Sequence, residues 1–124
     1  MTWILDSDRP IYAQLVEKIQ MQIVSGFYHP GDRLPSVRDL AQEASVNPNT
    51  MQKAFTELER CGLIITKRTS GRIVTEDTDM IKNIQLELAT ENIKAFLANM
   101  KQLGYTENEI VTLIEKITKE DTVQ

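Results

Sequence analysis

Apolar residues recur at helical spacing along most of the chain, and the breaks between these runs predict three short helices, a β-hairpin and two longer helices. The first run lies between Pro10 and Gly26 and places an apolar residue at every fourth position: Ile11, Leu15, Ile19 and Ile23. Proline is favoured at the first position of a helix, and glycine commonly ends one. We therefore expect the first helix to begin at Pro10 and to stop at Gly26.

A second, short helix is predicted behind Pro35. Ser36 and Asp39 have the spacing of a capping box, in which the two side chains satisfy free backbone amides at the start of a helix. The face expected to be buried carries Val37, Leu40, Ala41 and Ala44. This helix is expected to begin at Ser36 and to end near Ala44.

A third helix is predicted to open at Asn47. Asparagine is a favoured N-cap, and Pro48 suits the first helical position because its missing N–H is not needed there. One side of this helix is apolar as far as the stop signal Gly62, and it consists of Met51, Ala54, Phe55, Leu58 and the sulfur of Cys61. The opposite side is polar and basic: Asn49, Gln52, Lys53, Thr56 and Arg60.

A β-hairpin is predicted after the third helix. Residues 63–66 and 72–75 are two short β-prone runs, and the residues between them, 67–71, are basic and polar. Two short helices joined by a tight turn over 45–47 match a helix-turn-helix, and a hairpin directly behind it makes the unit a winged one. The predicted fold class is therefore mainly α with a small β-hairpin wing.

The tail of the chain is predicted to be a two-helix hairpin. Two apolar stripes run along a helix from about Asp79 to Leu103, and a single packing partner cannot cover both. Gly104 is the expected stop, and Thr106 with Glu109 has the spacing of another capping box. The last helix carries Ile110, Leu113, Ile114 and Ile117 in register.

Charge is distributed unevenly between the winged part and the tail. The chain has 124 residues and a net charge of −4, but residues 1–75 carry +1 and residues 76–124 carry −5. Residues 33–72 alone carry +3. A local basic surface can bind a polyanion on an acidic protein, because salt screens charges beyond about 10 Å. We therefore expect a winged helix-turn-helix DNA-binding domain over 1–76 and an acidic helical dimerisation tail over 77–124.

Six motifs lie in order between Pro10 and about Val74: Pro10-Ile11-Tyr12-Ala13-Gln14-Leu15, Gly31-Asp32-Arg33-Leu34-Pro35-Ser36-Val37-Arg38-Asp39-Leu40-Ala41, Val46-Asn47-Pro48-Asn49-Thr50, Lys53-Ala54, Glu57-Leu58-Glu59 and Gly62-Leu63-Ile64. Together they resemble the GntR family of bacterial transcription regulators, and within it the short YtrA-like subfamily. The resemblance implies a winged helix-turn-helix and a homodimer formed through the tail. We therefore expect a repressor that binds a double-stranded DNA operator, and two equivalent recognition helices in a dimer predict an inverted repeat in that operator.

The residues expected to contact DNA come from the second and third helices and the wing. By the resemblance, Arg38 reaches the DNA backbone or an adjacent base, while Asn49 and Thr50 lie in the first turn of the recognition helix. Gln52 stands where many relatives have arginine, and its amide suits an adenine edge. The expected set is Arg33, Arg38, Asn47, Asn49, Thr50, Gln52, Lys53, Lys67, Arg68, Gly71 and Arg72, with the basic wing residues at phosphates or in the minor groove.

Dimerisation is expected to bury the apolar surplus of the tail, since large exposed apolar patches are rare on monomers. The residues expected at the seam are Ile84, Leu88, Phe96, Leu97, Met100 and Ile114. Two alternatives stay open: a winged-helix module that binds protein, and a ligand sensor with a pocket for an unknown small-molecule effector at the dimer seam.

Other classes of function find little support in the sequence. Paired acids lie two residues apart and do not face each other on a helix, and no nucleophile motif or Gly-rich phosphate loop occurs, so enzyme activity is not expected. One cysteine, Cys61, and one histidine, His29, cannot supply a structural zinc site, and we expect no cofactor. No segment approaches the roughly 20 apolar residues of a membrane span, so a cytoplasmic location is expected.

Overall fold

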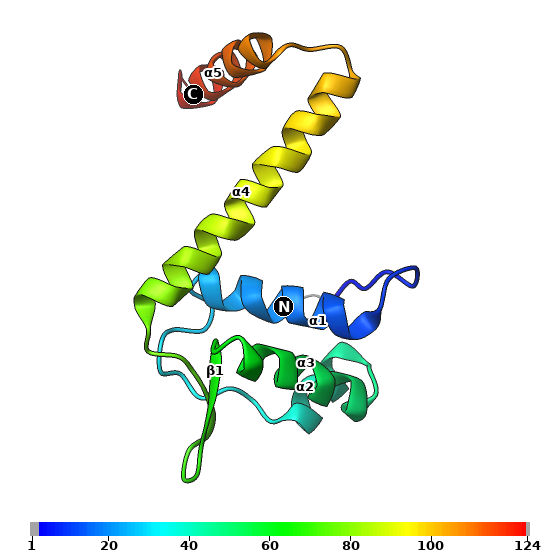
Figure 1. Cartoon of the computed structure of the whole chain (residues 1–124), viewed down its shortest axis with the longest axis vertical. Helices are drawn as coiled ribbons and strands as arrows, with labels where there is room; N and C mark the ends of the chain where they lie inside the picture. The colour runs from blue at the N-terminus through cyan, green and yellow to red at the C-terminus, as the bar shows by residue number, and fades with distance from the viewer. Residues whose placement is uncertain (1–2, 124) are drawn as a thin grey trace. The chain divides into compact units, whose positions relative to one another are not determined.

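The computed structural model describes the backbone of residues 3–123 and the side chains of residues 3–120. The chain divides into two compact units, Met1–Gln85 and Leu86–Gln124. The first unit contains α1 (Ile11–Val24), α2 (Val37–Ala44), α3 (Pro48–Arg60), β1 (Ile64–Lys67) and β2 (Gly71–Val74). Helix α4 (Thr78–Gln102) begins in the first unit and ends in the second, which also contains α5 (Glu107–Val123) (Figure 1). The predicted fold class, mainly helical with one small hairpin, is confirmed.

Local capping contacts set the starts of the helices in the first unit. Pro10 is the N-cap of α1 and not its first residue, and Ser36 likewise precedes α2. The Oγ of Ser36 accepts a hydrogen bond from the N–H of Asp39 (3.0 Å), and the Oδ1 of Asn47 accepts one from the N–H of Asn49 (2.8 Å). Since both contacts join residues that are close in sequence, the residue pattern predicts these helix starts well.

The turn between α2 and α3 is a compact backbone structure. Ser45 has a left-handed backbone with φ of 58°, which residues other than glycine adopt rarely. The N–H of Val46 donates to the carbonyl of Ala41 (2.9 Å) and ties the turn to the end of α2. Helices α2 and α3 are therefore joined by the short turn over 45–47 that the sequence predicts, and they pack against each other.

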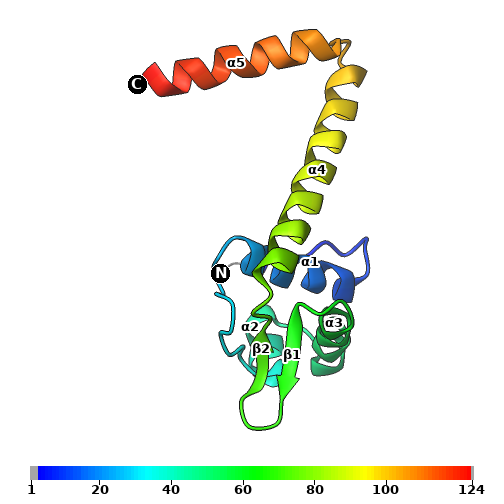
Figure 2. The same cartoon turned by 60° about the vertical axis from the view of Figure 1, so that its left-hand side comes forward.

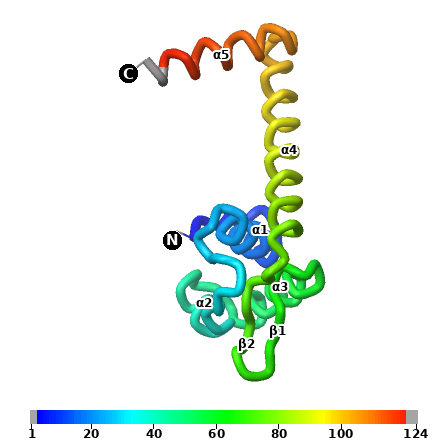
Figure 3. The backbone as a smooth tube through the Cα atoms, turned by 90° about the vertical axis from the view of Figure 1, so that its left-hand side faces the viewer, coloured from blue at the N-terminus to red at the C-terminus, as the bar shows by residue number. Residues whose placement is uncertain are grey.

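Helix α3 is the centre of the first unit, since it packs against α1, α2 and β1 (Figure 3). Its Met51, Ala54, Phe55 and Leu58 have no exposed surface, as the apolar spacing predicts. The same core cluster includes Leu15 and Ile19 of α1, Leu40 of α2, and Ile64 and Val74 of the hairpin. Burial on this scale holds α3 in place and leaves its polar side outward.

The end of α3 differs from the prediction at Cys61. The sulfur of Cys61 does not join the apolar side: the residue is exposed, because α3 ends at Arg60 and Cys61 is its C-cap. Gly62 is the predicted stop and has a φ of 88°. A Cβ at Gly62 would lie 2.9 Å from the Cε of Met80, the end of a flexible side chain that can move aside, so glycine is favoured there by its left-handed backbone.

The wing is an antiparallel hairpin in which Ile64 pairs with Val74 and Lys67 pairs with Gly71 (Figure 2). The strands are each displaced by one residue from the predicted ranges, 63–66 and 72–75. The reason is the pairing of Lys67 with Gly71, which places both in the ladder and leaves only 68–70 as the loop.

The segment 31–34, which the sequence pattern leaves as a connection, lies along the second edge of β2. Three backbone hydrogen bonds join them: Gly31 N–H to Val74 O (2.9 Å), Val74 N–H to Asp32 O (2.8 Å) and Leu34 N–H to Arg72 O (2.9 Å). Strand β2 is thus bonded on both edges, by β1 and by this segment. Because the segment leads directly into α2, the wing and the helix-turn-helix form one structure.

The first turns of α4 belong to the core of the first unit. Ile81 is 9% exposed, and Met80 and Ile84 pack against the core cluster. The Nε2 of Gln85 donates to the carbonyl of Val24 at the end of α1 (3.2 Å). The first unit consequently extends to Gln85, whereas the change in composition places the domain limit after residue 76.

The second unit begins within α4 and ends with α5. The capping box predicted at its turn is present: the N–H of Thr106 donates to Glu109 Oε1 (2.9 Å), and the N–H of Glu109 donates to Thr106 Oγ1 (3.2 Å). The hydrogen bond from the Thr106 backbone, and then its hydroxyl, lower the pKa of Glu109. Ile110 is fully buried, but other large apolar side chains stay exposed: Leu86, Ile93, Phe96, Leu103, Tyr105, Val111, Ile114 and Ile117.

Candidate nucleic-acid interface

The side of α3 that faces away from the core is polar. Asn49, Gln52, Lys53 and Thr56 are exposed, and Thr50 is half-buried. The hydroxyl of Thr56 donates to the backbone carbonyl of Gln52 (3.0 Å), and the Gln52 amide lies 3.4 Å from the same hydroxyl. Amide and hydroxyl groups in this arrangement are the donors and acceptors that read base edges in the major groove.

Asn47 is placed differently from the other predicted contacts of this helix. Its Oδ1 is used as the N-cap of α3, where it accepts the N–H of Asn49. An N-cap of this kind stabilises a helix start by about 1 kcal/mol. The structure thus gives Asn47 a role in holding the first turn, while the Asn49 side chain remains exposed beside it.

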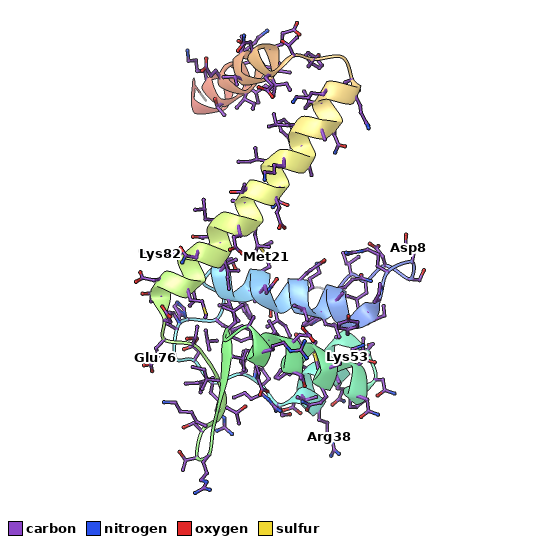
Figure 4. All side chains as sticks on the ribbon, viewed as in Figure 1. Asp8, Met21, Arg38, Lys53, Glu76 and Lys82 are labelled. Atoms are coloured by element: carbon purple, nitrogen blue, oxygen red, sulfur yellow. The ribbon has the colours of Figure 1, made fainter. Side chains whose placement is uncertain are left out.

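Arg38 projects from the first turn of α2, toward the same end of the first unit as the tip of the wing (Figures 1 and 4). It is exposed, and within the described part of the chain its guanidinium forms no ion pair, even with its neighbour Asp39. The charge is therefore available to an external anion. Arginine suits this role because its planar fork makes charge-assisted hydrogen bonds with phosphate oxygens.

Lys53 is held by an aromatic partner that the sequence pattern does not reveal. Its Nζ lies 3.8 Å from the centre of the Tyr12 ring of α1, in a cation–π contact. Such contacts at exposed sites contribute about 0.5–1 kcal/mol. Lys53 is therefore oriented along the junction of α1 and α3, although it stays exposed.

The basic residues of the wing fall into two groups. Lys67 and Arg68, at the tip, are exposed and form no ion pair among the described residues. Arg72 is half-buried, and its Nε donates to Glu59 Oε1 of α3 at 2.7 Å. The tip is consequently open to solvent, whereas Arg72 is engaged within the protein.

The loop end of β2 lies beside the segment that leads into α2, where Arg33 meets Gly71. Arg33 is exposed and forms an isolated β-bridge with Ile73, and its Nε lies 3.8 Å from the position of a Cβ on Gly71. Gly71 has a φ of 73°, which fits the turn that closes the hairpin. A hollow of about 160 Å³ lies at this junction and is lined by Arg33, Leu34, Pro35, Ser36, Gly71 and Arg72.

The predicted seam residues are placed in two ways. Ile84 packs against the core of the first unit, and Leu88, Leu97 and Met100 are half-buried. Phe96 and Ile114 are 41% and 42% exposed, one on α4 and one on α5. The exposed pair belongs to the larger apolar surface of the tail that a single chain leaves uncovered.

Sequence reasoning missed the partners that orient the basic residues. Tyr12, Phe55 and Glu59 contact Lys53 or Arg72 across different elements, and none of them stands near its partner in the residue pattern. Of these three partners, only Glu59 could have been suspected from the sequence, because it is an acid, able to pair with a basic residue, in a segment that is otherwise rich in basic residues.

Other kinds of site are not indicated by the structure. Across residues 3–120, whose side chains the structure describes, acidic, cysteine and histidine residues do not gather in groups that could hold a metal ion. Within the same range, neither α4 nor any other helix has the apolar stretch that a membrane crossing needs.

Curated proteins similar to this chain are transcription regulators. The chain is 36% identical over 113 residues to the uncharacterized HTH-type transcriptional regulator YhcF of Bacillus subtilis (strain 168), covering 91% of this chain and 93% of that protein. It is 33% identical over 114 residues to the HTH-type transcriptional repressor YtrA of the same organism, covering 90% of this chain and 87% of that protein.

Solved structures with the same fold are also regulators. A GntR family transcriptional regulator from Listeria monocytogenes superposes with a TM-score of 0.83 at 38% identity, covering 90% of this chain and 98% of that one. The DNA-binding domain of AraR, in complex with operator ORE1, superposes with a TM-score of 0.52 at 30% identity, covering 60% of this chain and 94% of that one.

A family match joins these similarities to the site. Residues 11–74 match the bacterial regulatory proteins of the gntR family, and this range begins with α1 and ends with β2. It therefore includes α2, α3 and the whole wing, from which the exposed polar and basic side chains project. Because the match spans more than half of the chain and every element of the winged helix-turn-helix, the chain belongs to the GntR family, as a DNA-binding transcriptional regulator.

Proposed function

We propose that the protein is a repressor that binds an inverted-repeat operator as a homodimer, with α3 of each subunit in the major groove. The observation that carries this proposal is the shared direction of Arg38 and the wing tip, beside the exposed polar side of α3 (Figures 1 and 4). The repressor role is supported by the similarity to YtrA, which is named a transcriptional repressor. Such a regulator acts in the cytoplasm, where bacterial DNA lies.

The proposed division of labour follows the chemistry of the exposed groups. Asn49 and Gln52 carry amides, which pair with adenine in two-pronged fashion and so read sequence. Arg38, Lys67 and Arg68 carry charges, which neutralise phosphates and position the protein without reading sequence. The wing therefore supports affinity, and α3 supports the choice of operator.

The proposed dimer is supported by the apolar side chains that one chain leaves exposed in the second unit. Leu86 and Ile93 are 66% and 58% exposed, and Ile117 on α5 is 48% exposed. A run of such residues on both helices is unusual for a monomer and typical of an interface. A second copy is the proposed occupant, because an identical apolar surface on each chain allows a closed two-fold contact.

The operator is expected to be an inverted repeat with half-sites about one helical turn apart, because two-fold symmetry presents two equivalent α3 helices to one face of the duplex. The operator can be recovered by selection from a random duplex library with the full-length protein, and hydroxyl-radical footprinting then maps the protected positions. Two protected half-sites related by a dyad are expected. A single asymmetric site occupied by one chain would contradict the proposed homodimer.

Arg38→Ala is expected to weaken binding of the selected operator and of random DNA together. The slope of the logarithm of the binding constant against the logarithm of the salt concentration is expected to become shallower by about 0.9 for each phosphate that the variant no longer neutralises. Asn49→Ala is expected to leave random DNA largely unaffected and to reduce discrimination between bases by about 1–3 kcal/mol. Fluorescence anisotropy titrations over a range of salt concentrations measure both quantities.

Arg60→Ala is the matched control, since Arg60 is exposed on α3 but paired with Glu57 (3.3 Å). It is expected to bind both duplexes like the wild type. If Arg38→Ala kept the wild-type affinity and salt dependence, the proposed placement of α2 against DNA would be wrong.

A further inference from the structure

Arg72 is the one predicted DNA contact of the wing whose charged group is already bound by the protein. Its Nε donates to Glu59 Oε1 at 2.7 Å, and the two side chains are 29% and 32% exposed. Its guanidinium carbon lies 5.3 Å from the centre of the Phe55 ring, and that ring is fully buried. Arg72 thus contacts two side chains of α3 at once.

This contact holds the wing to α3 nearer the tip of the hairpin than the core residues Ile64 and Val74, which pair with each other at its base. Glu59 lies in the last turn of α3, and Arg72 lies in β2 opposite Thr66 of β1. The backbone carbonyl of Arg72 also accepts the N–H of Leu34, in the segment that leads into α2. A short two-stranded hairpin is only marginally stable alone, so such anchors decide where its tip lies.

We propose that Glu59 and Arg72 form a clamp that positions the wing against α3, and that Arg72 serves DNA binding through this clamp instead of through a phosphate contact. The inference rests on the proposed DNA-binding function and assigns Arg72 a positioning role within it. Lys67 and Arg68 then make the phosphate contacts of the wing, and the clamp places them.

The electrostatics favour positioning over direct contact. A guanidinium whose Nε is bonded to a carboxylate forms a neutral pair, which attracts phosphate far less than a free arginine does. A neighbouring ion pair on the same helix shows the contrast. Glu57 and Arg60 lie 3.3 Å apart with side chains 37% and 74% exposed, and they join no second element. A pair of that kind contributes little.

The test compares Glu59→Gln and Arg72→Gln in the full-length protein. The probes are the duplex that the wild type selects from a random library and one unselected duplex. Each substitution is expected to weaken binding about tenfold, as for loss of a hydrogen bond between charged groups. The double variant is expected to lose no more than either single one, because both changes remove the same clamp. Glu57→Gln, which removes an equal charge from the same helix, is the matched control and is expected to bind like the wild type.

Two measurements on Glu59→Gln are decisive: the salt dependence of its DNA binding, and the loss of affinity that Arg68→Gln causes in its background. A misplaced wing neutralises fewer phosphates, so the salt slope is expected to fall although an acidic group has been removed. For the same reason, Arg68→Gln is expected to weaken binding clearly in the wild type and little in the Glu59→Gln background. A role in folding alone would not produce this dependence, and thermal unfolding of each variant monitors the fold.

If Glu59→Gln binds as tightly as the wild type, or more tightly, while Arg72→Gln binds weakly with a lower salt slope, Arg72 is a phosphate contact and the clamp is wrong. If Glu59→Gln does not fold, the double variant Arg68→Gln with Arg72→Gln replaces it. Losses of binding free energy that add up from the two single variants would overturn the clamp, and a smaller loss in the double variant would support it.

Hydrogen exchange of the wing amides, measured without DNA, tests the clamp apart from the proposed function. Faster exchange at Ile65 and Ile73, which pair in the ladder, is expected in both clamp variants but not in Glu57→Gln. Unchanged exchange of these amides in either clamp variant would contradict the clamp. Failure of the wild type to select any duplex would contradict the proposed function and leave this measurement to decide the clamp.

Discussion

Replacing Phe96 and Ile114 together with aspartate is expected to convert the proposed dimer into monomers and to weaken operator binding by about a hundredfold or more. The two side chains are 41% and 42% exposed on a single chain, so the substitutions act on the surface offered to a second copy. Charges buried in an apolar seam are costly. A monomer must also engage each half-site separately, without the raised local concentration that the linked second subunit provides.

Sedimentation velocity measures the mass, and anisotropy with the selected operator measures the affinity. The matched control is Thr90→Asp with Thr112→Asp, which adds the same two charges at exposed threonines whose hydroxyls donate to backbone carbonyls of their own helices. This control is expected to remain dimeric. A full-length wild type that sediments as a monomer, or a Phe96 and Ile114 variant that still dimerises, would show that the seam lies elsewhere.

A shortened protein complements these substitutions, and the structure decides where to cut. Residues after Glu76 include Ile81, which is 9% exposed in the core of the first unit, so a cut after Glu76 would expose that core. A cut after Gln85 keeps the whole first unit. The shorter protein is expected to fold as a monomer with weak operator binding.

Replacing Phe55 with alanine is expected to lower the free energy of unfolding by about 3–5 kcal/mol. Phe55 has no exposed surface and lies in α3, which packs against α1, α2 and β1. Its ring also lies under the guanidinium of Arg72. Such a loss is a large share of the about 5–15 kcal/mol that stabilises a typical protein. Chemical denaturation at a fixed protein concentration measures it.

Phe27→Ala is the matched control for Phe55→Ala, because Phe27 is 57% exposed and the substitution removes the same atoms from the surface. Its free energy of unfolding is expected to stay within about 0.5 kcal/mol of the wild type. A loss below about 1 kcal/mol for Phe55→Ala would mean that α3 is not the centre of the core and that other contacts hold the recognition helix.

Local contacts explain why so much of the fold can be predicted from the sequence. The caps at Ser36, Asn47 and Thr106 bond to amides two or three residues away, and the stop at Gly62 depends on its own backbone angle. These signals are complete within a few residues of chain. The apolar repeat then selects the buried face of α3 without reference to any other element.

The candidate site could be predicted only in part. Exposure of Arg38, Gln52 and Arg68 follows from their places on polar faces and in a loop, and the structure shows all of them exposed. Whether a basic residue is free or paired depends on a partner far along the chain. Arg72 and Glu59 are separated by thirteen positions, and Lys53 meets Tyr12 of another helix.

By itself, the sequence of this protein determined its helices, its turns and the polar side of the recognition helix, because each follows from short-range hydrogen bonding or from periodic burial. Only the tertiary structure decided that the segment 31–34 lies along β2, that the first unit extends to Gln85, and that Arg72 is held by α3. Contacts between residues far apart in the chain depend on how the helices and strands pack. Several strand registers and side-chain partners are compatible with the same local sequence pattern, and packing of the core selects one of them.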